Sequence, residues 1–344
     1  MLPDRNGIGV FGMDAPTLKD LVTIPGVWDR VELVEGRLIE ASTADDAFLT
    51  KIAQHLITAG GKRFRPLLAQ LGAELGPVVD YRAIDAGAAV ELIHIGSLYH
   101  DDVIDEAETR RGAVSVNANW TNTIAILAGD FLMARASEVA ADTLGQEAVR
   151  LLARTYAELV EGQTLELQLT DDLTHGVEDY YRVIAGKTAS LIRTSARLGA
   201  MASDAPTETI EAISTATWEL GMVFQITDDA LDLVATEEVL GKPAGSDIHQ
   251  GVFTLPVLHA LGGPDGERIR TLLSATRPYA DESVNEVISL VRSNGFVDRT
   301  LDECDGRLRV AQAAIAVLPE GPVRDIFSAM GRFLIDRVTV ARDS

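Results

Sequence analysis

Two short clusters of aspartates have the spacing in this chain that most clearly suggests chemistry. They are Asp101-Asp102-Val-Ile-Asp105 and Asp228-Asp229-Ala-Leu-Asp232. In each cluster the carboxylates at positions i and i+4 share one face of a helix, where like charges destabilise each other. A cation relieves that repulsion, and Mg²⁺ commonly takes one or two protein carboxylates together with substrate phosphates. One such cluster alone is usually a solvated helix end, but two clusters, each closing an apolar helix, predict a diphosphate held through Mg²⁺.

Basic residues gather where such an anion would need them. The segment Gly60-Gly-Lys-Arg-Phe-Arg-Pro66 places Lys62 and Arg65 on a glycine-rich loop before a helix, where backbone N–H groups also favour phosphate. We expect Arg63, in the same segment, to be a solvated side chain. Further basic residues follow the two clusters or lie between them: Arg110, Arg111, Lys187 and Lys242. Together these residues predict two anionic groups, one bound through metal and one bound directly by Lys and Arg.

Composition narrows the class of protein. The 344 residues carry 52 Asp plus Glu against 30 Lys plus Arg, a net charge of −22, which disfavours nucleic acid and electrostatic docking to membranes. The single Cys304 excludes an internal disulfide and a cysteine-based zinc site. The N-terminus lacks the pattern of a signal peptide, and the longest uncharged stretch, residues 112–129, is too polar to span a bilayer. We therefore expect a cytoplasmic protein.

Helical spacing of apolar residues extends over most of the chain, and alternating strand patterns are scarce. The clearest helical segments are Asp85 to Asp102, Ile124 to Ala140, Glu147 to Leu169, Tyr180 to Met201, Glu208 to Leu233, Leu255 to Leu261 and Leu301 to Leu318. No linker divides them. We predict one all-α domain, a helical bundle around a deep central cavity, over residues 28–344, after an N-terminal extension over residues 1–27.

Several segments, in order from about residue 50 to 262, resemble the trans-isoprenyl diphosphate synthase (polyprenyl synthetase) family. They are Gly60-Gly-Lys-Arg-Phe-Arg-Pro66, Glu91-Leu-Ile-His94, Ser97 to Asp105, Arg110-Arg111-Gly112, Gly129-Asp130, Glu161-Gly-Gln163, Lys187-Thr188, Phe224 to Asp232 and Gly241-Lys-Pro243. The resemblance implies a long-chain enzyme that joins isopentenyl diphosphate to a C10 to C20 allylic diphosphate. It also implies a homodimer and three Mg²⁺ ions per active site.

The resemblance also implies a role for each matching residue. Asp101, Asp105 and Asp228 would bind Mg²⁺ most directly, supported by Asp102, Asp229 and Asp232. Lys62, Arg65, His94 and Arg111 would bind the diphosphate of isopentenyl diphosphate. Arg110, Lys187, Thr188, Gln225 and Lys242 would contact the allylic diphosphate or its metal shell. Of these residues, Asp101, Asp105, Asp228 and Lys187 would be the catalytic ones.

Two regions of the sequence bear on how the allylic diphosphate is bound and on product length. Where the family commonly has a lysine, in Asp-x-x-x-Gly-Lys-x-Thr, this chain has Val252, and His249 could substitute. In the family, bulky aromatics just before the first aspartate cluster stop chain growth early. Here those positions are Gly96 and Ser97, with Ile93 one turn further down, so we expect an open tunnel, a product of C30 to C50, and a shorter product when Gly96 or Ser97 is replaced by Phe.

The sequence is compatible with several further interpretations. A terpene cyclase shares the first aspartate cluster but needs no second diphosphate site, so Lys62, Arg65 and Arg111 argue against it. A short-chain synthase, a weakly catalytic subunit of a heteromeric synthase and a plain helical scaffold stay open. Because the product would be lipid-like, transient contact with a membrane is compatible with the synthase interpretation.

Overall fold

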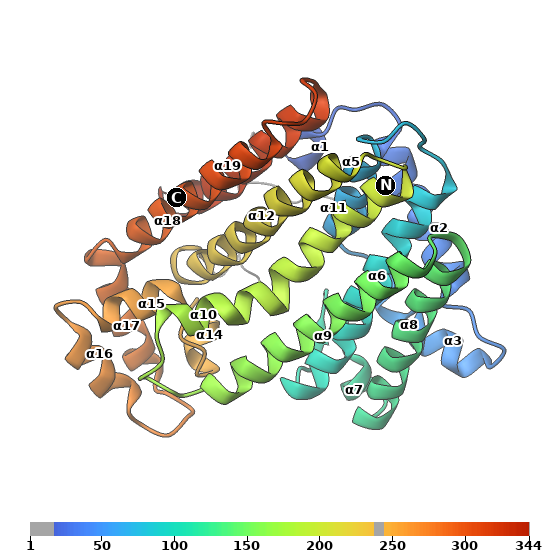
Figure 1. Ribbon diagram of the computed structural model, residues 1–344. Coiled ribbons are helices and arrows are strands. Elements are labelled where there is room, and N and C mark those ends of the chain that lie inside the picture. The colour runs from blue at the N-terminus through green and yellow to red at the C-terminus, as the bar shows by residue number, and fades with distance from the viewer. Residues whose placement is uncertain (1–16, 237–243, 344) are drawn as a thin grey trace.

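The computed structural model describes residues 17–236 and 244–343, and Figure 1 shows that they form helices almost throughout. The helices of the first half are α1 (Leu18–Leu21), α2 (Val27–Ala41), α3 (Ala47–Ala53), α4 (His55–Thr58), α5 (Phe64–Ala73), α6 (Tyr81–Ile104), α7 (Val116–Asn119), α8 (Asn122–Thr143) and α9 (Gln146–Leu169). Within the described ranges, the one sheet is a hairpin of β1 (Thr109–Arg110) and β2 (Ala113–Val114). The prediction of an all-α fold is confirmed.

The second half adds the helices that complete the bundle. They are α10 (Val177–Ile184), the π-helical turn η1 (Ala185–Ala189), α11 (Ser190–Ala202), α12 (Thr207–Val234), α14 (Ser246–His249), α15 (Leu255–Leu261), α16 (Gly266–Leu273), α17 (Asp281–Ser293), α18 (Phe296–Ile315) and α19 (Pro322–Asp343). The sequence predicts a single helix from Tyr180 to Met201. The structure instead inserts η1 between α10 and α11, and such π turns are frequent at functional sites.

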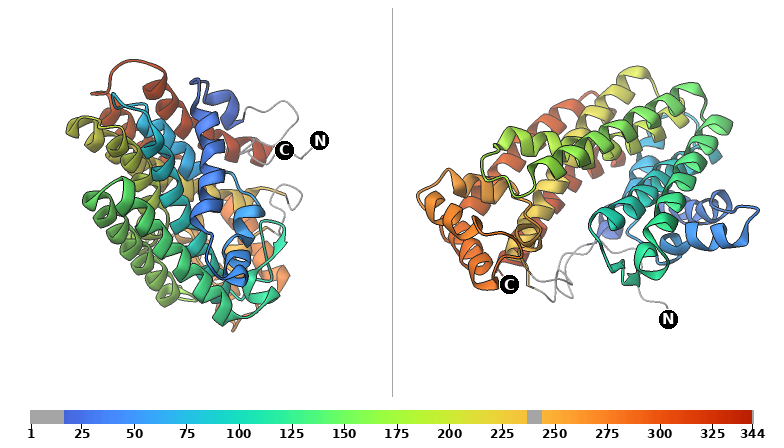
Figure 2. Two further views of the ribbon diagram at one scale, coloured as in Figure 1. Left: turned by 90° about the vertical axis from the view of Figure 1, so that its right-hand side faces the viewer. Right: turned by 90° about the horizontal axis from the view of Figure 1, so that it is seen from below.

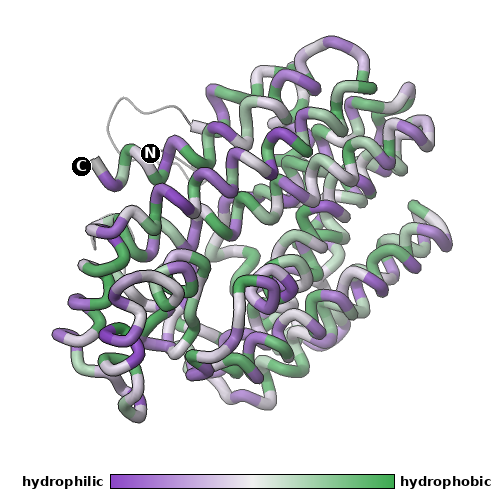
Figure 3. Tube along the Cα trace, turned by 60° about the vertical axis from the view of Figure 1, so that its left-hand side comes forward, coloured by the Kyte–Doolittle hydropathy of each residue, from purple (hydrophilic) through white to green (hydrophobic). Residues whose placement is uncertain are grey.

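The long helices pack in a continuous series. α6 packs against α5 and α8, α11 lies between α5 and α12, and α12 also contacts α18 and α19. Figure 1 shows α9, α11 and α12 side by side, and Figure 2 shows the blue N-terminal helices and the orange helices α15–α17 at opposite ends of the molecule. Hydrophobic and hydrophilic residues alternate along the helices in Figure 3, as expected when one face of each helix is buried.

Two features of the helices α6 and α12 position the aspartate clusters. The Asp80 carboxylate begins α6 by accepting a hydrogen bond from the backbone N–H of Arg82 at 2.9 Å. The clusters then come at the carboxyl ends of α6 and α12, which finish at Ile104 and Val234. That end of a helix carries partial negative charge, so carboxylates there are disfavoured unless cations compensate them.

Part of the predicted N-terminal extension packs against the helical bundle. Leu18 and Val22 are each 1% exposed, and α1 packs against α19 near the other end of the chain. The folded region therefore begins before residue 28, because these two side chains belong to the core. Among the residues that the structure describes, no helix is both long and apolar enough to cross a membrane.

Candidate active site

The first aspartate cluster divides its side chains between the site and the protein interior. Asp101 is half-buried and Asp105 is exposed at the end of α6, whereas Asp102 is fully buried. The buried carboxylate of Asp102 accepts a hydrogen bond from Nε of Arg110 at 2.6 Å. Burial raises the pKa of Asp101 to about 6, with nearby Asp105 adding to the rise and Lys187 opposing it. Asp101 and Asp105 are therefore a crowded pair of carboxylates that a cation would stabilise.

The second cluster is divided in the same way. The side chain of Asp228 is 49% exposed, but Asp229 and Asp232 are buried. Asp229 accepts hydrogen bonds from the Tyr180 hydroxyl at 2.6 Å and from Nε2 of Gln225 at 2.8 Å. Burial raises the pKa of Asp229 well above its usual range, and the charge of Asp247 adds to the rise.

The remaining aspartate of this cluster links α12 to the segment that follows it. Oδ2 of Asp232 accepts a hydrogen bond from the backbone N–H of Asp247 at 3.2 Å, and its carbonyl oxygen accepts one from Gly245 at 2.9 Å. Asp232 therefore holds this segment in place. Asp228 is the exposed carboxylate of the cluster.

Lys187 lies on η1, close to the first cluster. It forms an ion pair with Glu166 of α9. Burial works against its charge, but Glu166, Asp101 and Asp105 outweigh that effect, so the pKa of Lys187 is raised. The neighbouring Thr188 donates a hydrogen bond to Oε1 of Gln225 at 2.7 Å. The π turn therefore connects the first cluster to the residues that hold Asp229.

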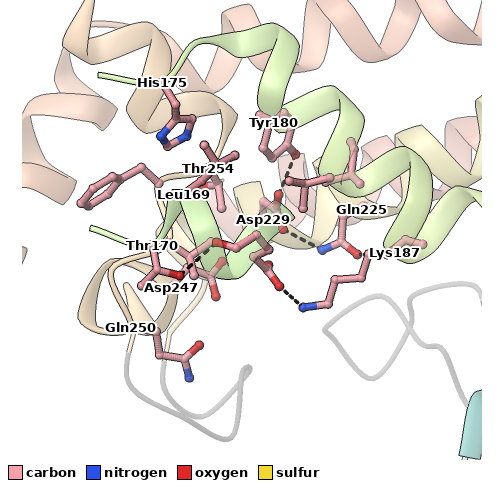
Figure 4. Close-up of a pocket in the computed structure, with 16 residues that line it drawn as sticks. Leu169, Thr170, His175, Tyr180, Lys187, Gln225, Asp229, Asp247, Gln250 and Thr254 are labelled. Carbon is pink, nitrogen blue, oxygen red and sulfur yellow. Dashed lines mark hydrogen bonds and ion pairs between the residues drawn. The ribbon is translucent and has the colours of Figure 1, made fainter. Parts of the chain in front are cut away.

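Two cavities of about 170 Å³ and 330 Å³ meet at this point. Their shared lining residues are Glu166, Thr170, Lys187, Gln250 and Val252. The smaller cavity extends to Gln225 and Asp229, and the larger one extends to Asp105. Figure 4 shows Tyr180 and Gln225 pointing toward Asp229, with Lys187 beside them. Residues of both aspartate clusters therefore line one continuous space.

A separate group of cationic side chains surrounds His94. Burial and the charges of Arg65 and Arg111 keep the pKa of His94 well below its usual range, so its imidazole is neutral at pH 7. Burial lowers the pKa of Arg65 to about 10, and its buried Nε has no hydrogen-bond partner among the described residues. Nη1 of Arg111 donates to the carbonyl oxygen of Gly60 at 2.6 Å. Buried cations with an unused donor suit an anionic ligand.

The expectation that Arg63 is solvated is wrong. Arg63 is 3% exposed, its Nη1 contacts Glu91 at 3.0 Å, and its Nη2 contacts Glu35 at 2.8 Å. The spacing of charges on one loop could not show that two glutamates from other helices surround this side chain. Arg63 fixes the loop that carries Lys62 and Arg65.

Three other predicted binding residues are placed as follows. The Nε of Arg110 is engaged by Asp102 through the hydrogen bond already described. Lys62 lies near Asp228 and Arg337, and burial followed by the charge of Arg337 lowers its pKa. Lys242 lies outside the described residues.

Among the residues predicted to set product length, Gly96 differs from expectation. A Cβ on Gly96 would lie 2.9 Å from Cε of Met133 and 3.1 Å from the carbonyl oxygen of Gly129. Gly96 therefore faces α8 and does not open onto a tunnel, because its missing side chain lets the two helices approach. Ile93 and Ser97 are 3% and 5% exposed, and Ser97 donates to the carbonyl oxygen of His94 at 2.8 Å.

His249 does not take the place of the missing lysine. Its Nε2 lies 3.8 Å from Asp281, and it lines a different cavity together with Asn285 and Arg292. Val252, at the lysine position, lines both cavities of the site. The short helix α14 turns His249 away because the two residues lie on different sides of the turn at Gly251.

Sequence reasoning missed four residues of this region. They are Glu166, Tyr180, Asp247 and Arg337. Asp247 is the first residue of the segment that departs from the family pattern at Val252. That pattern could therefore have indicated Asp247 as a residue of the site. The others are single residues in ordinary helices, and only their tertiary contacts distinguish them.

The donor set fits Mg²⁺ of the kind that substrate phosphates complete. Among the described residues, no three His, Cys, Asp or Glu side chains gather closely enough to hold a metal by themselves. Asp105 lines the larger cavity. Asp101 on α6 is half-buried and Asp228 on α12 is 49% exposed, so these carboxylates stay accessible to a ligand. Mg²⁺ keeps several waters and needs only one or two protein carboxylates when phosphates supply further oxygens.

Comparison with known proteins gives a consistent result. The polyprenyl synthetase family model matches residues 46–291. Nonaprenyl diphosphate synthase from Mycobacterium tuberculosis is 41% identical over 332 residues, which cover 95% of this chain and 97% of that protein. Heptaprenyl diphosphate synthase component 2 from Geobacillus stearothermophilus is 37% identical, with 89% of this chain and 95% of that protein covered.

Solved structures of prenyl diphosphate synthases superpose on most of this chain. A decaprenyl diphosphate synthase from Rhodobacter capsulatus superposes with a TM-score of 0.85 at 30% identity, covering 93% of this chain and 99% of that one. A geranylgeranyl pyrophosphate synthase from Corynebacterium glutamicum, complexed with calcium and isoprenyl diphosphate, gives 0.81 at 38% identity, covering 92% and 99%. Because the family model matches residues 46–291 and relatives at 37% and 41% identity cover nearly the whole chain, this chain belongs to the polyprenyl synthetase family.

Proposed function

We propose that this prenyltransferase extends an allylic diphosphate with isopentenyl diphosphate to a long-chain all-trans polyprenyl diphosphate. The observation that carries this assignment is the presence of two different anion-binding environments. One is the space lined by residues of both aspartate clusters, and the other is the group formed by Arg65, His94 and Arg111. A reaction that joins two diphosphate substrates needs both.

Mg²⁺, held by Asp101, Asp105 and Asp228 together with the allylic diphosphate, would neutralise the charge that builds up on the leaving group. We propose three ions per site, as the family resemblance implies. The crystal structure of the Corynebacterium glutamicum relative contains calcium and isoprenyl diphosphate, which supports a divalent cation. Lys187 adds a fixed positive charge on the same side.

The chain's own residues would position the reaction. The C1–O bond of the allylic substrate breaks, and its electron pair leaves with the diphosphate. The double bond of isopentenyl diphosphate attacks C1, and the new cation loses a proton to an oxygen of the departing diphosphate. Arg65, the neutral His94 and Arg111 would hold the second diphosphate by donating hydrogen bonds. No protein nucleophile is needed.

Incubation of the purified protein with Mg²⁺, labelled isopentenyl diphosphate and C10, C15 or C20 allylic primers tests the assignment. We expect condensation, with product length read by chromatography, and loss of activity in Asp228→Asn. Absence of product with every primer would contradict it. Two relatives are named heptaprenyl diphosphate synthase component 2, so activity that appears only after addition of a second subunit would favour a heteromeric synthase.

A long product is supported by relatives named nonaprenyl and octaprenyl diphosphate synthase. It is also supported by Ser97, which lies one helical turn below Asp101 on the same face and is small. Ser97→Phe should shorten the product, whereas Ser97→Ala should not. Gly96→Phe is a poorer probe, because its side chain would enter the contact with α8. An unchanged product in Ser97→Phe would show that chain length is set elsewhere.

We propose that the protein is a homodimer formed through α8 and α9, which contact each other. Large apolar side chains are exposed on both helices: Ile126, Leu127, Val160 and Leu167. Leu127→Glu should give a monomer by light scattering, whereas Leu33→Glu, equally exposed on α2, should leave the dimer intact. A monomeric wild-type protein would overturn this assignment. Cytoplasmic location, transient membrane contact and the catalytic domain boundaries stay predictions.

A further inference from the structure

Arg337 is a buried cation whose contact with a carboxylate, among the residues that the structure describes, is long. It lies on α19, is 5% exposed, and its Nε has no hydrogen-bond partner among the described residues. Its Nη1 is 4.0 Å from Oδ1 of Asp228, beyond hydrogen-bond distance. By contrast, Arg332 on the same helix meets Asp305 at 2.9 Å. Burying a guanidinium without close hydrogen bonds is costly, and the long contact with Asp228 offsets little of that cost, so Arg337 is suited to an anionic ligand.

A second cation lies beside Arg337. Lys62 comes from the loop before α5 and is exposed, and it lies close enough to Arg337 and Asp228 for both charges to act on it. Two positive side chains therefore converge on one carboxylate, and they come from segments far apart in the sequence. The excess of positive charge next to the exposed Asp228 favours an anion with several oxygens.

The position does not require arginine for packing. Leu334 and Val338, one turn before Arg337 and directly after it, are buried in the core that α19 shares with α12. An apolar side chain would pack there without the cost of removing a charge from water. The guanidinium is therefore best explained by what it binds.

We propose that Arg337 and Lys62 together bind the diphosphate of the non-allylic substrate, so that the C-terminal helix supplies a substrate-binding residue. The identity of that substrate as isopentenyl diphosphate rests on the proposed function. Arg337 would then tie α19 to the loop that carries Lys62 whenever the diphosphate is bound. Asp228, beside both cations, would place this diphosphate next to the second aspartate cluster.

Calorimetric titration of the whole protein with inorganic pyrophosphate, in EDTA so that no metal contributes, tests the anion site directly. Arg337→Gln should weaken binding roughly ten- to hundred-fold, as expected for a charge-assisted contact. Arg337→Lys should restore part of the affinity. Arg332→Gln removes the same charge from an exposed position of the same helix and should bind like the wild type. Arg337→Met keeps the apolar stem and serves as a second variant if Arg337→Gln does not fold.

Steady-state kinetics then identify the substrate. Arg337→Gln should raise KM for isopentenyl diphosphate and leave KM for the allylic diphosphate and kcat nearly unchanged. Wild-type affinity for pyrophosphate in both Arg337→Gln and Arg337→Met would overturn the anion site, and a raised KM for the allylic substrate alone would overturn the assignment to the other one. If the wild type condenses no substrates but loses pyrophosphate binding with Arg337→Gln, the anion site stands and the proposed function falls.

Discussion

At the scale of single residues, the period of the α-helix decides what each aspartate does. Asp101 and Asp105 lie on one face and reach the site, while Asp102, rotated by about 100°, is buried against Arg110. Asp228 and Asp229 differ in the same way, and Tyr180 and Gln225 donate to the inner carboxylate. Of two adjacent carboxylates, one is therefore accessible to ligands, and the other accepts hydrogen bonds within the protein.

Replacing an exposed aspartate should lower activity, whereas replacing a buried aspartate should lower stability. Asp101→Ala and Asp228→Ala should lower kcat/KM by about 10³-fold, as expected when charge stabilisation in the transition state is lost. For Asp101→Ala the free energy of unfolding should stay the same or rise, because repulsion at a helix end is removed.

Asp229→Ala is the comparison, and it should destabilise the protein by about 2 kcal/mol, because Tyr180 and Gln225 lose their acceptor. Denaturant unfolding measures the free energies, and steady-state assays measure the rates. Equal destabilisation by Asp101→Ala and Asp229→Ala would contradict the separation.

His94 makes stability depend on pH. Burial and the neighbouring arginines keep the folded pKa well below its usual range, whereas the unfolded chain takes up a proton near pH 6.5. The unfolded state then binds more protons in acid, so stability falls as the pH falls below about 6.5. Relative to His94→Gln, the wild type should lose about 1 kcal/mol more between pH 7 and 5.5. Parallel unfolding curves for the two proteins would show that His94 is not held neutral.

At the scale of elements, close approach of α9 to the π turn positions Lys187. A Cβ on Gly162 would lie 2.6 Å from the backbone nitrogen of Lys187, and one on Gly186 would lie 2.6 Å from the carbonyl oxygen of Glu158. The two glycines thus let the backbones touch, and Glu166 on the same α9 pairs with Lys187. The motif Glu161-Gly-Gln163 therefore has a geometric role.

Gly162→Ala should displace the π turn. We expect a loss of about 1–3 kcal/mol in the free energy of unfolding from overpacking, together with a fall in kcat as Lys187 moves. Gly36→Ala, in α2 with nothing within 4 Å of its new Cβ, is the matched control and should stabilise the protein slightly. Unfolding curves and kinetics of both variants check this. A fully active and stable Gly162→Ala would rule out the close contact.

At the scale of the whole molecule, local charge opposes the net charge. The chain carries −22 overall, yet four basic side chains gather around the site: Arg65 and Arg111 are half-buried, Arg337 is buried, and Lys62 is exposed. The exposed carboxylates form pairs rather than complete metal sites, and among the described residues no three such groups gather. Cation and diphosphate should therefore bind together.

Thermal unfolding with added ligands tests this coupling. Mg²⁺ alone should raise Tm only slightly, and pyrophosphate with Mg²⁺ should raise it by several degrees, because ligands that bind only the folded state stabilise it by mass action. Removal of Mg²⁺ with EDTA should abolish most of the shift. A large rise with Mg²⁺ alone would reveal a metal site built entirely by the protein.

The sequence by itself determined the all-α class and the two aspartate clusters, and the comparisons confirm the family that its motifs indicated. These features depend on helical periodicity and on short-range spacing, which one segment can encode. The tertiary structure decided the rest: Arg63 is buried between Glu35 and Glu91, Gly96 faces α8, and Arg337 lies beside Lys62. Each of these contacts joins distant segments, and burial by those segments sets the charge and reach of a side chain, so no local pattern could predict them.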